Sequence, residues 1–214
     1  MERKIKALIF DVGAVLCLVK NMKKRTSKNL LSSYREACFL LKDISVDPEQ
    51  VYSNTKEIYF KSSAGKISKT EALGLFSKAL DVSPKKTEKV FEDVYRKNTI
   101  ENKKLYDHVL KLKKEGYKIG ILSTQFHLSK KILIPEKYYK NFNALVISCD
   151  DKLKKPDPKS FELILRRLRV KPNQVLFIDD KQENLDAAEK LSIKSLIFKN
   201  NTQFFNGLKK LGIT

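Results

Sequence analysis

The chain has 214 residues, of which 42% are hydrophobic, and it carries a formal net charge of +19. A chain of this length and composition can bury a core, which excludes an intrinsically disordered protein. No apolar stretch approaches the roughly 20 residues that cross a bilayer, and the apolar run near the N-terminus is too short for a signal peptide. We therefore expect a cytoplasmic protein with no membrane partner.

The excess of lysine is compatible with a nucleic-acid partner. The lysines are spread along the chain in no single block and beside no nucleic-acid motif, so we favour a generally lysine-rich composition. The three cysteines form no CxxC pair, which indicates reduced thiols with a structural role (Cys17, Cys38 and Cys149). No oligomeric state is predicted.

Residues 5–10 form the first predicted strand, in which four consecutive apolar residues lead directly into Asp11. This pattern is typical of a buried strand that delivers a carboxylate to the edge of a sheet. A second copy lies near the other end of the chain, where residues 175–178 lead into Asp179 and Asp180. A site built from both copies requires that the two strands lie close together.

Between residues 27 and 96 the apolar residues recur with helical spacing. Asp47, Ser68 and Ser83 are suitable helix N-caps, and Glu71 lies three residues after Ser68, as in a capping box. We therefore expect a small all-helical insertion after the first strand.

Strand and helix patterns then alternate to the end of the chain. The predicted strands are residues 118–122, 145–148, 175–178 and 194–198, and the predicted helices include residues 105–115, 161–168 and 187–191. This order predicts an α/β fold, a doubly wound parallel sheet of the Rossmann-like type. Ligands of such sheets bind at the carboxyl ends of the strands, where we place Asp11, Ser123, Asp179 and Asp180.

Carboxylates gathered at one sheet edge repel one another unless a cation lies between them, and hard oxygen ligands suit Mg²⁺. With such a metal bound, Asp11 can attack an electrophilic phosphorus while Ser123 and Lys155 neutralise the phosphoryl oxygens. Each residue alone also fits a structural role, as a helix cap, a solvated carboxylate or a turn hydroxyl. Their order, each at a predicted strand end, favours a catalytic site.

In this order the motifs resemble those of the haloacid dehalogenase-like (HAD) hydrolases, most of which are phosphatases, and the resemblance covers nearly the whole chain. It implies that Asp11 is a nucleophile that forms an aspartyl-phosphate. It also implies a phosphate-binding set and a Mg²⁺ cofactor. The phosphate-binding residues would be Ser123, Thr124 and Lys155, and the metal ligands would be Asp11, the backbone carbonyl of Gly13 and Asp180, with Asp179 and Asn184 as further or neighbouring ligands.

The resemblance also implies two domains. Residues 1–18 and 98–214 would form the α/β hydrolase core, and residues 19–97 a helical cap that closes over the site and selects the substrate. Two segments are similar to the branch of the family that includes sugar-phosphate phosphatases, such as those acting on glucose 1-phosphate. These segments are Gly65-Lys66-Ile67-Ser68 and Pro135-Glu136-Lys137-Tyr138.

The chain departs from the family pattern at Gly13, where most members carry a second Asp that protonates the leaving oxygen. Glycine transfers no proton, and loss of a general acid typically costs about 10² to 10⁴ in rate. The branch that this chain resembles includes phosphatases with the same glycine. His127 is a candidate substitute, although a lone histidine in a loop is more often a solvated surface residue. Thr124 and Lys152 are smaller departures, at positions where the family often has Asn and Gly.

These features predict a Mg²⁺-dependent phosphoric monoester hydrolase that acts on a small phosphorylated metabolite such as a sugar phosphate. One alternative is a catalytically weakened member that binds a phosphorylated or polyanionic partner, as Gly13 and the net charge of +19 would allow. A 2-haloacid dehalogenase is disfavoured, because dehalogenases of this family lack the acidic pair that Asp179 and Asp180 form here.

Overall fold

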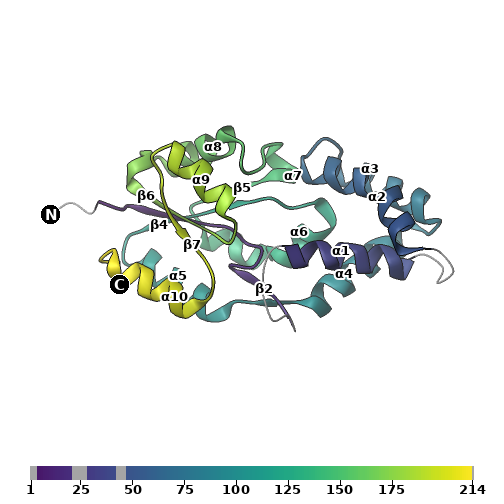
Figure 1. Cartoon of the computed structure of the whole chain (residues 1–214), viewed down its shortest axis with the longest axis horizontal. Helices are drawn as coiled ribbons and strands as arrows, with labels where there is room; N and C mark the ends of the chain where they lie inside the picture. Colours follow the sequence, from purple (N-terminus) through teal and green to yellow (C-terminus); the bar gives the residue numbers. More distant parts are fainter. Residues whose placement is uncertain (1–3, 21–27, 42–46, 214) are drawn as a thin grey trace.

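The computed structural model describes residues 4–20, 28–41 and 47–213, and its centre is a parallel five-stranded sheet (Figure 1). The first strand lies in the middle and pairs in parallel with a strand on each side. The predicted doubly wound α/β sheet is therefore confirmed. In spatial order the strands are β5 (Ala144–Ile147), β4 (Lys118–Ser123), β1 (Ala7–Phe10), β6 (Val175–Asp179) and β7 (Lys194–Ile197).

Helices cover both faces of this sheet, which makes a three-layer core (Figure 1). Successive side chains of a strand point to opposite faces, so Leu8 and Phe10 of β1 pack on one side while Ala7 and Ile9 pack on the other. The layer beyond Leu8 and Phe10 contains α5 (Lys103–Lys114) and α10 (Asn201–Lys210), and the opposite layer contains α8 (Pro158–Leu168) and α9 (Gln182–Lys190). Short elements connect these layers: α6 (His127–Leu133), η1 (Glu136–Asn141), α7 (Ser148–Asp151) and η2 (Pro172–Gln174).

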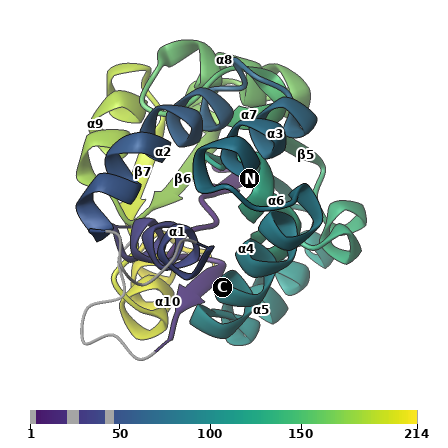
Figure 2. The same cartoon turned by 90° about the vertical axis from the view of Figure 1, so that its right-hand side faces the viewer.

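Four helices between β1 and β4 lie together beyond one end of the sheet (Figures 1 and 2). Three begin at the predicted caps: the side chains of Asp47, Ser68 and Ser83 accept hydrogen bonds from the first turns, and Ser68 forms a capping box with Glu71. Residue 27, where the predicted helical stretch begins, lies outside the described residues. The helices are α1 (Lys28–Leu41), α2 (Pro48–Ser63), α3 (Lys69–Leu80) and α4 (Pro84–Asn98).

An aromatic cluster holds this insertion together and joins it to the core. The Tyr34 ring is buried, with its centroid 4.5 Å from that of Tyr59 and 6.1 Å from that of Phe91. Phe126, which precedes α6 of the core, places its ring 5.0 Å from that of Tyr59 and 5.6 Å from that of Phe91. The four helices therefore bury their apolar faces partly against the core.

Two short strands connect the core and the insertion. β2 (Cys17–Val19) and β3 (Thr99–Glu101) form an antiparallel ribbon, with Cys17 opposite Glu101. At three residues each, these strands are too short to show an alternating pattern, and the sequence did not predict them. In the described part of the chain, no helix is both long enough and apolar enough to span a membrane.

Candidate active site

The first group of the site is Asp11, which follows β1 and is buried at the carboxyl edge of the sheet. Ser123 ends the neighbouring strand β4 and donates a hydrogen bond from its Oγ to Asp11 Oδ1, at 2.9 Å. The Nζ atom of Lys155 lies 2.9 Å from the same carboxylate oxygen. Three residues that the sequence singled out separately therefore meet at one oxygen atom.

The strand order explains why Asp11 and Ser123 meet, with Asp179 beside them. β1 lies between β4 and β6, so the loops that follow these three strands leave the sheet side by side. The chain order reverses at this position, and ligands of doubly wound sheets bind at such a point. Asp11, Ser123 and Asp179 stand at the ends of these three strands.

Lys155 connects the two acidic strand ends. Its ammonium group is buried and lies 2.5 Å from Asp179 Oδ2 as well as 2.9 Å from Asp11 Oδ1. Burial lowers the pKa of Lys155, but the carboxylates of Asp11 and Asp179 outweigh that effect and raise it above its ordinary value. Lys155 is therefore a fixed positive charge at the centre of the site.

Asp179 uses both of its oxygen atoms within the protein. Oδ2 accepts hydrogen bonds from Lys155 and, at 3.0 Å, from Asn184 Nδ2, and Oδ1 accepts one from the backbone N–H of Lys181 at 2.9 Å. Asn184 therefore contacts Asp179 directly. This arrangement orients Asp179 to hold Lys155, which is the role that we assign to it.

The third carboxylate is that of Asp180. One oxygen each from Asp11, Asp179 and Asp180 lie within 4.8 Å of one another. Burial raises the pKa of Asp11 to about 6, Lys155 opposes this rise, and the charges of Asp179 and Asp180 add to it. A divalent cation would relieve this repulsion, and an all-oxygen donor set fits Mg²⁺.

Gln125 is a buried member of the site that the sequence did not indicate. Its Nε2 donates to Ser123 Oγ at 3.0 Å, while its Oε1 accepts a hydrogen bond from Ser129 Oγ at 3.2 Å. The chain Ser129–Gln125–Ser123 thereby orients the hydroxyl that faces Asp11. Its position two residues after a strand end was a weak signal, because loops often carry glutamine without function.

A cleft of about 390 Å³ opens above Asp11 and Lys155. The insertion supplies one wall, which includes Tyr59, Phe60 and Tyr95. The core supplies the remainder, including Gly13, Thr124, Gln125, Lys154, Lys181 and Asn184. The cleft therefore combines a basic floor with an aromatic wall.

The loop between α2 and α3 docks against the core beside this cleft. Gly65 has φ +66°, and a Cβ atom there would lie 2.9 Å from the carbonyl oxygen of Cys149 and 3.0 Å from that of Ser148. Ser148 Oγ donates to the carbonyl oxygen of Ser63 at 2.6 Å. Of the second segment compared with sugar-phosphate phosphatases, the side chains of Lys137 and Tyr138 lie outside the described residues.

His127 belongs to this contact, and the expectation of a solvated loop histidine was wrong. It is the first residue of α6 and is half-buried, its N–H donates to Ser62 Oγ at 3.1 Å, and its Nε2 lies 3.0 Å from the carbonyl oxygen of Ile67. The ring is thus directed to the insertion.

Lys152 follows the end of α7, at a position where the family often has glycine. Its φ is +60°, a left-handed conformation that glycine adopts most easily, which explains the preference of the family for glycine there.

The fold and the site together define an α/β protein with an acidic, lysine-containing centre at the carboxyl edge of its sheet. A family model described as haloacid dehalogenase-like hydrolase matches residues 5–191. The chain therefore belongs to the haloacid dehalogenase-like hydrolases.

Two curated relatives match parts of the chain. It is 33% identical over 88 residues to Acyl-CoA dehydrogenase family member 10 of Mus musculus, a match that spans 41% of this chain and 8% of that protein. It is 28% identical over 93 residues to the pyrophosphatase PpaX of Bacillus mycoides, a match that spans 43% of each protein. The chain thus matches less than half the length of these relatives.

A solved structure matches more completely. A HAD-family enzyme of Bacteroides thetaiotaomicron superimposes with a TM-score of 0.73 at 20% identity, covering 94% of this chain and 98% of that one. At this identity the likeness shows the shared fold. The same enzyme has been crystallised in complex with magnesium and inorganic phosphate.

Proposed function

We propose that this protein is a Mg²⁺-dependent phosphomonoesterase that uses Asp11 as its nucleophile. The observation that carries the proposal is the meeting of Asp11, Ser123 and Lys155 at one carboxylate oxygen, with both contacts at 2.9 Å. A nucleophile held beside a hydroxyl donor and a fixed ammonium group suits transfer of an anionic phosphoryl group. The magnesium and phosphate complex of the Bacteroides enzyme supports this proposal by analogy.

In the first half of the reaction, a carboxylate oxygen of Asp11 forms a bond to phosphorus on the side opposite the leaving oxygen. The bond between phosphorus and the leaving oxygen then breaks, which produces an aspartyl-phosphate and an alkoxide. Ser123 and Lys155 stabilise the equatorial phosphoryl oxygens, and Gln125 keeps the Ser123 hydroxyl oriented. Thr124, which is exposed and lines the cleft, would bind the same phosphate.

The alkoxide takes a proton from water as it departs. In the second half, the oxygen of a water molecule attacks the phosphorus of the aspartyl-phosphate, the bond between phosphorus and the Asp11 oxygen breaks, and the Asp11 carboxylate and inorganic phosphate are released. Asp11, Asp180 and the backbone carbonyl of Gly13 would hold Mg²⁺, which supplies charge neutralisation between the carboxylates and the phosphate. Asp179 and Asn184 act through Lys155 and the Lys181 loop as positioning residues.

Gly13 supplies no proton to the leaving oxygen, and His127 does not replace the missing acid, because its ring is directed to Ile67 of the insertion. We therefore expect the enzyme to prefer esters whose leaving group needs little protonation. A glycosyl phosphate at the anomeric carbon has such a leaving group, because its alcohol is more acidic than an ordinary alkanol. We therefore favour a sugar 1-phosphate over a simple alkyl phosphate as the substrate.

The helical insertion, residues 19–97 in our division, acts as a cap in this proposal. The cleft volume of about 390 Å³ suits a small metabolite, and Tyr59 and Phe60 offer aromatic faces to a sugar ring. Lys154 and Lys181, near the floor, add positive charge for the phosphate.

The test is hydrolysis of p-nitrophenyl phosphate and a panel of sugar, nucleotide and flavin phosphates, in Mg²⁺ and in EDTA. Turnover that needs Mg²⁺ and is lost in Asp11→Asn is expected. Asp93→Asn, which changes an exposed carboxylate of α4, is the matched control and should retain activity. Turnover that survives in Asp11→Asn or in EDTA would overturn the mechanism.

Gly13 motivates one other candidate, a catalytically weakened member that binds a phosphorylated partner. This alternative predicts saturable binding of inorganic phosphate with Mg²⁺, steep salt dependence and no turnover across the panel. Release of halide from short 2-haloacids would instead indicate the dehalogenase, which the Asp179–Asp180 pair disfavours.

A further inference from the structure

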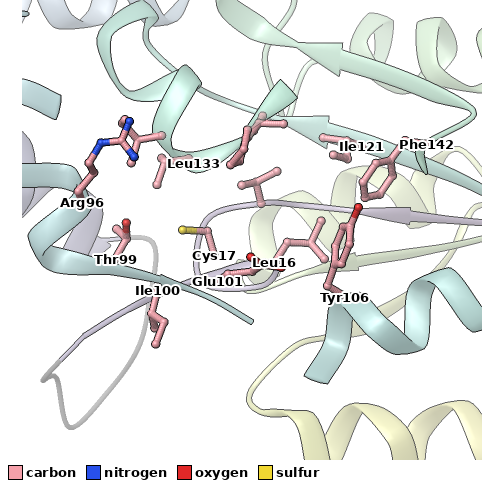
Figure 3. Close-up of a pocket in the computed structure, with 14 residues that line it drawn as sticks. Leu16, Cys17, Arg96, Thr99, Ile100, Glu101, Tyr106, Ile121, Leu133 and Phe142 are labelled. Atoms are coloured by element: carbon pink, nitrogen blue, oxygen red, sulfur yellow. The ribbon is translucent and has the colours of Figure 1, made fainter. Parts of the chain in front are cut away.

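A second cavity lies next to the catalytic cleft. Its volume is about 270 Å³, and Leu133 lines both spaces. Figure 3 shows side chains that converge on it from several elements, among them Leu16, Cys17, Ile121, Leu133 and Phe142. Asp11 and Lys155 both line the catalytic cleft and neither lines this cavity, so it is a separate space.

Both connections between core and insertion form walls of this cavity. Cys17 begins β2 and Leu16 directly precedes it, and Thr99, Ile100 and Glu101 form β3, its antiparallel partner. Tyr106 of α5 and Phe142 form the core side. A molecule bound here would therefore touch both linkers on which the insertion is carried.

The walls favour an uncharged ligand. Most lining side chains are aliphatic or aromatic, and the two charged ones have opposite signs, Arg96 and Glu101. Two hydroxyl groups in the wall already have partners: Thr99 Oγ1 donates to the carbonyl oxygen of Tyr95 at 2.6 Å, and the Tyr106 hydroxyl accepts a hydrogen bond from Asn141 at 2.6 Å. An apolar ligand without formal charge therefore matches the side chains that line this cavity.

The volume sets the size of the ligand. An engineered apolar protein cavity of about 150 Å³ takes one benzene molecule. At about 270 Å³, the cavity has room for an apolar ligand of roughly twice the size of benzene. We propose that this cavity, which we call the linker cavity, binds a neutral, apolar small molecule of two to three rings at the hinge between core and insertion.

The test uses N-phenyl-1-naphthylamine, a neutral fluorophore, and its sulfonated analogue 1-anilinonaphthalene-8-sulfonate, which has the same rings and one negative charge. Saturable fluorescence enhancement is expected with the neutral probe, and at least about tenfold weaker affinity is expected with the sulfonate. Equal or tighter binding of the sulfonate, if it is weakened by Ile132→Trp and Cys17→Met, would overturn the ligand class, because these variants leave the basic catalytic cleft unfilled. Absence of saturable binding of the neutral probe would overturn the site.

Variants locate the bound probe. Ile132→Trp, at a half-buried lining position on α6, and Cys17→Met, on the opposite wall, should each lower the affinity at least about tenfold by filling the space. Ile58→Trp is the matched control, because Ile58 is also half-buried but lines neither cavity, and its affinity should equal that of wild type. Unchanged affinity in both filling variants would show that the probe binds elsewhere.

Hydrogen exchange of the unmodified protein gives an independent readout. Bound probe should slow exchange of the backbone amides in residues 17–19 and 99–101, the two strands in the cavity wall. If a filling variant fails to fold, this measurement still decides the question. Saturation without protection of either strand would contradict binding in the linker cavity. The same protection is expected in Asp11→Asn, which separates this inference from the proposed catalysis.

Discussion

Replacing Asp11 by asparagine should stabilise the metal-free protein while it removes the nucleophile. Burial raises the pKa of Asp11 from 3.8 to about 6, against the opposing effect of Lys155 and with added repulsion from Asp179 and Asp180. Each unit of pKa corresponds to about 1.4 kcal/mol, so the ionised carboxylate costs the folded state about 3 kcal/mol at neutral pH. The asparagine carbonyl retains an acceptor for Ser123 and Lys155 without that charge.

The pH dependence follows from the direction of this shift. Because the folded pKa is the higher one, the Asp11 contribution to stability is fully present below pH 3.8 and is lost as the pH rises through about 6. The advantage of Asp11→Asn should therefore grow over this window and stay constant above it. In EDTA at pH 7.5 we expect a gain of up to about 3 kcal/mol, or about 6 to 12 °C in Tm for a chain of this size.

Urea unfolding and thermal melts in EDTA at pH values from 4 to 8 measure this effect. Asp93→Asn is the control and should show no gain of this size, because Asp93 is exposed. Addition of Mg²⁺ should stabilise wild type more than Asp11→Asn, since the ion then neutralises the carboxylate. If Asp11→Asn is no more stable than wild type at pH 7.5, or if its gain is the same at pH 4, the ionised Asp11 carboxylate does not destabilise the folded protein as described.

Three further outcomes are expected. Gln125→Ala should lower kcat by about tenfold with little change in fold, because the Ser123 hydroxyl loses the amide that orients it. Steady-state kinetics with p-nitrophenyl phosphate measure this effect. An unchanged kcat would show that Gln125 does not orient Ser123 for catalysis. Gly65→Ala should lower the free energy of unfolding in urea by about 1 to 3 kcal/mol, because its Cβ would lie 2.9 Å from a core carbonyl oxygen. Gly74→Ala in α3 is the control: its Cβ meets nothing within 4 Å, so it should raise the free energy of unfolding by up to about 1 kcal/mol. Equal effects of the two substitutions would argue against docking of the Gly65 loop on the core. Burial raises the pKa of all three thiols, to about 11 for Cys17 and Cys38 and to about 12 for Cys149. A disulfide reagent at pH 8 should therefore react slowly with the native protein and rapidly with the protein unfolded in guanidinium. Fast reaction with the native protein would contradict the burial of the thiols.

Local signals in the sequence were sufficient for most of the core. Residues 175–178 are apolar enough to predict a buried strand, and Ser68 with Glu71 predicts a helix start, because each signal depends on neighbours within a few positions. The C-terminal helix α10 was not predicted, although Asn200 caps it through its side chain. Its buried apolar face includes only a few residues, among them Phe204 and Leu208, so helical periodicity gave too weak a signal to predict the helix.

The candidate site was predicted in outline because its residues stand at strand ends, where a parallel sheet brings them to one edge. Asp11 and Ser123 are 112 positions apart in the chain, yet their adjacency follows from the pairing of β1 with β4. Gln125 could not be identified in this way. Its role depends on the direction of one amide toward Ser123, which backbone topology does not specify.

The sequence by itself determined the class of fold, the acidic strand ends and the helical nature of the insertion, because these depend on local periodicity and on the order of elements. Only the tertiary structure decided that His127 faces the insertion, that Asp179 holds Lys155, and that the β2–β3 ribbon encloses the linker cavity. Each of these contacts joins residues more than 20 positions apart. Such contacts depend on how whole elements pack in space, and no short sequence pattern records that.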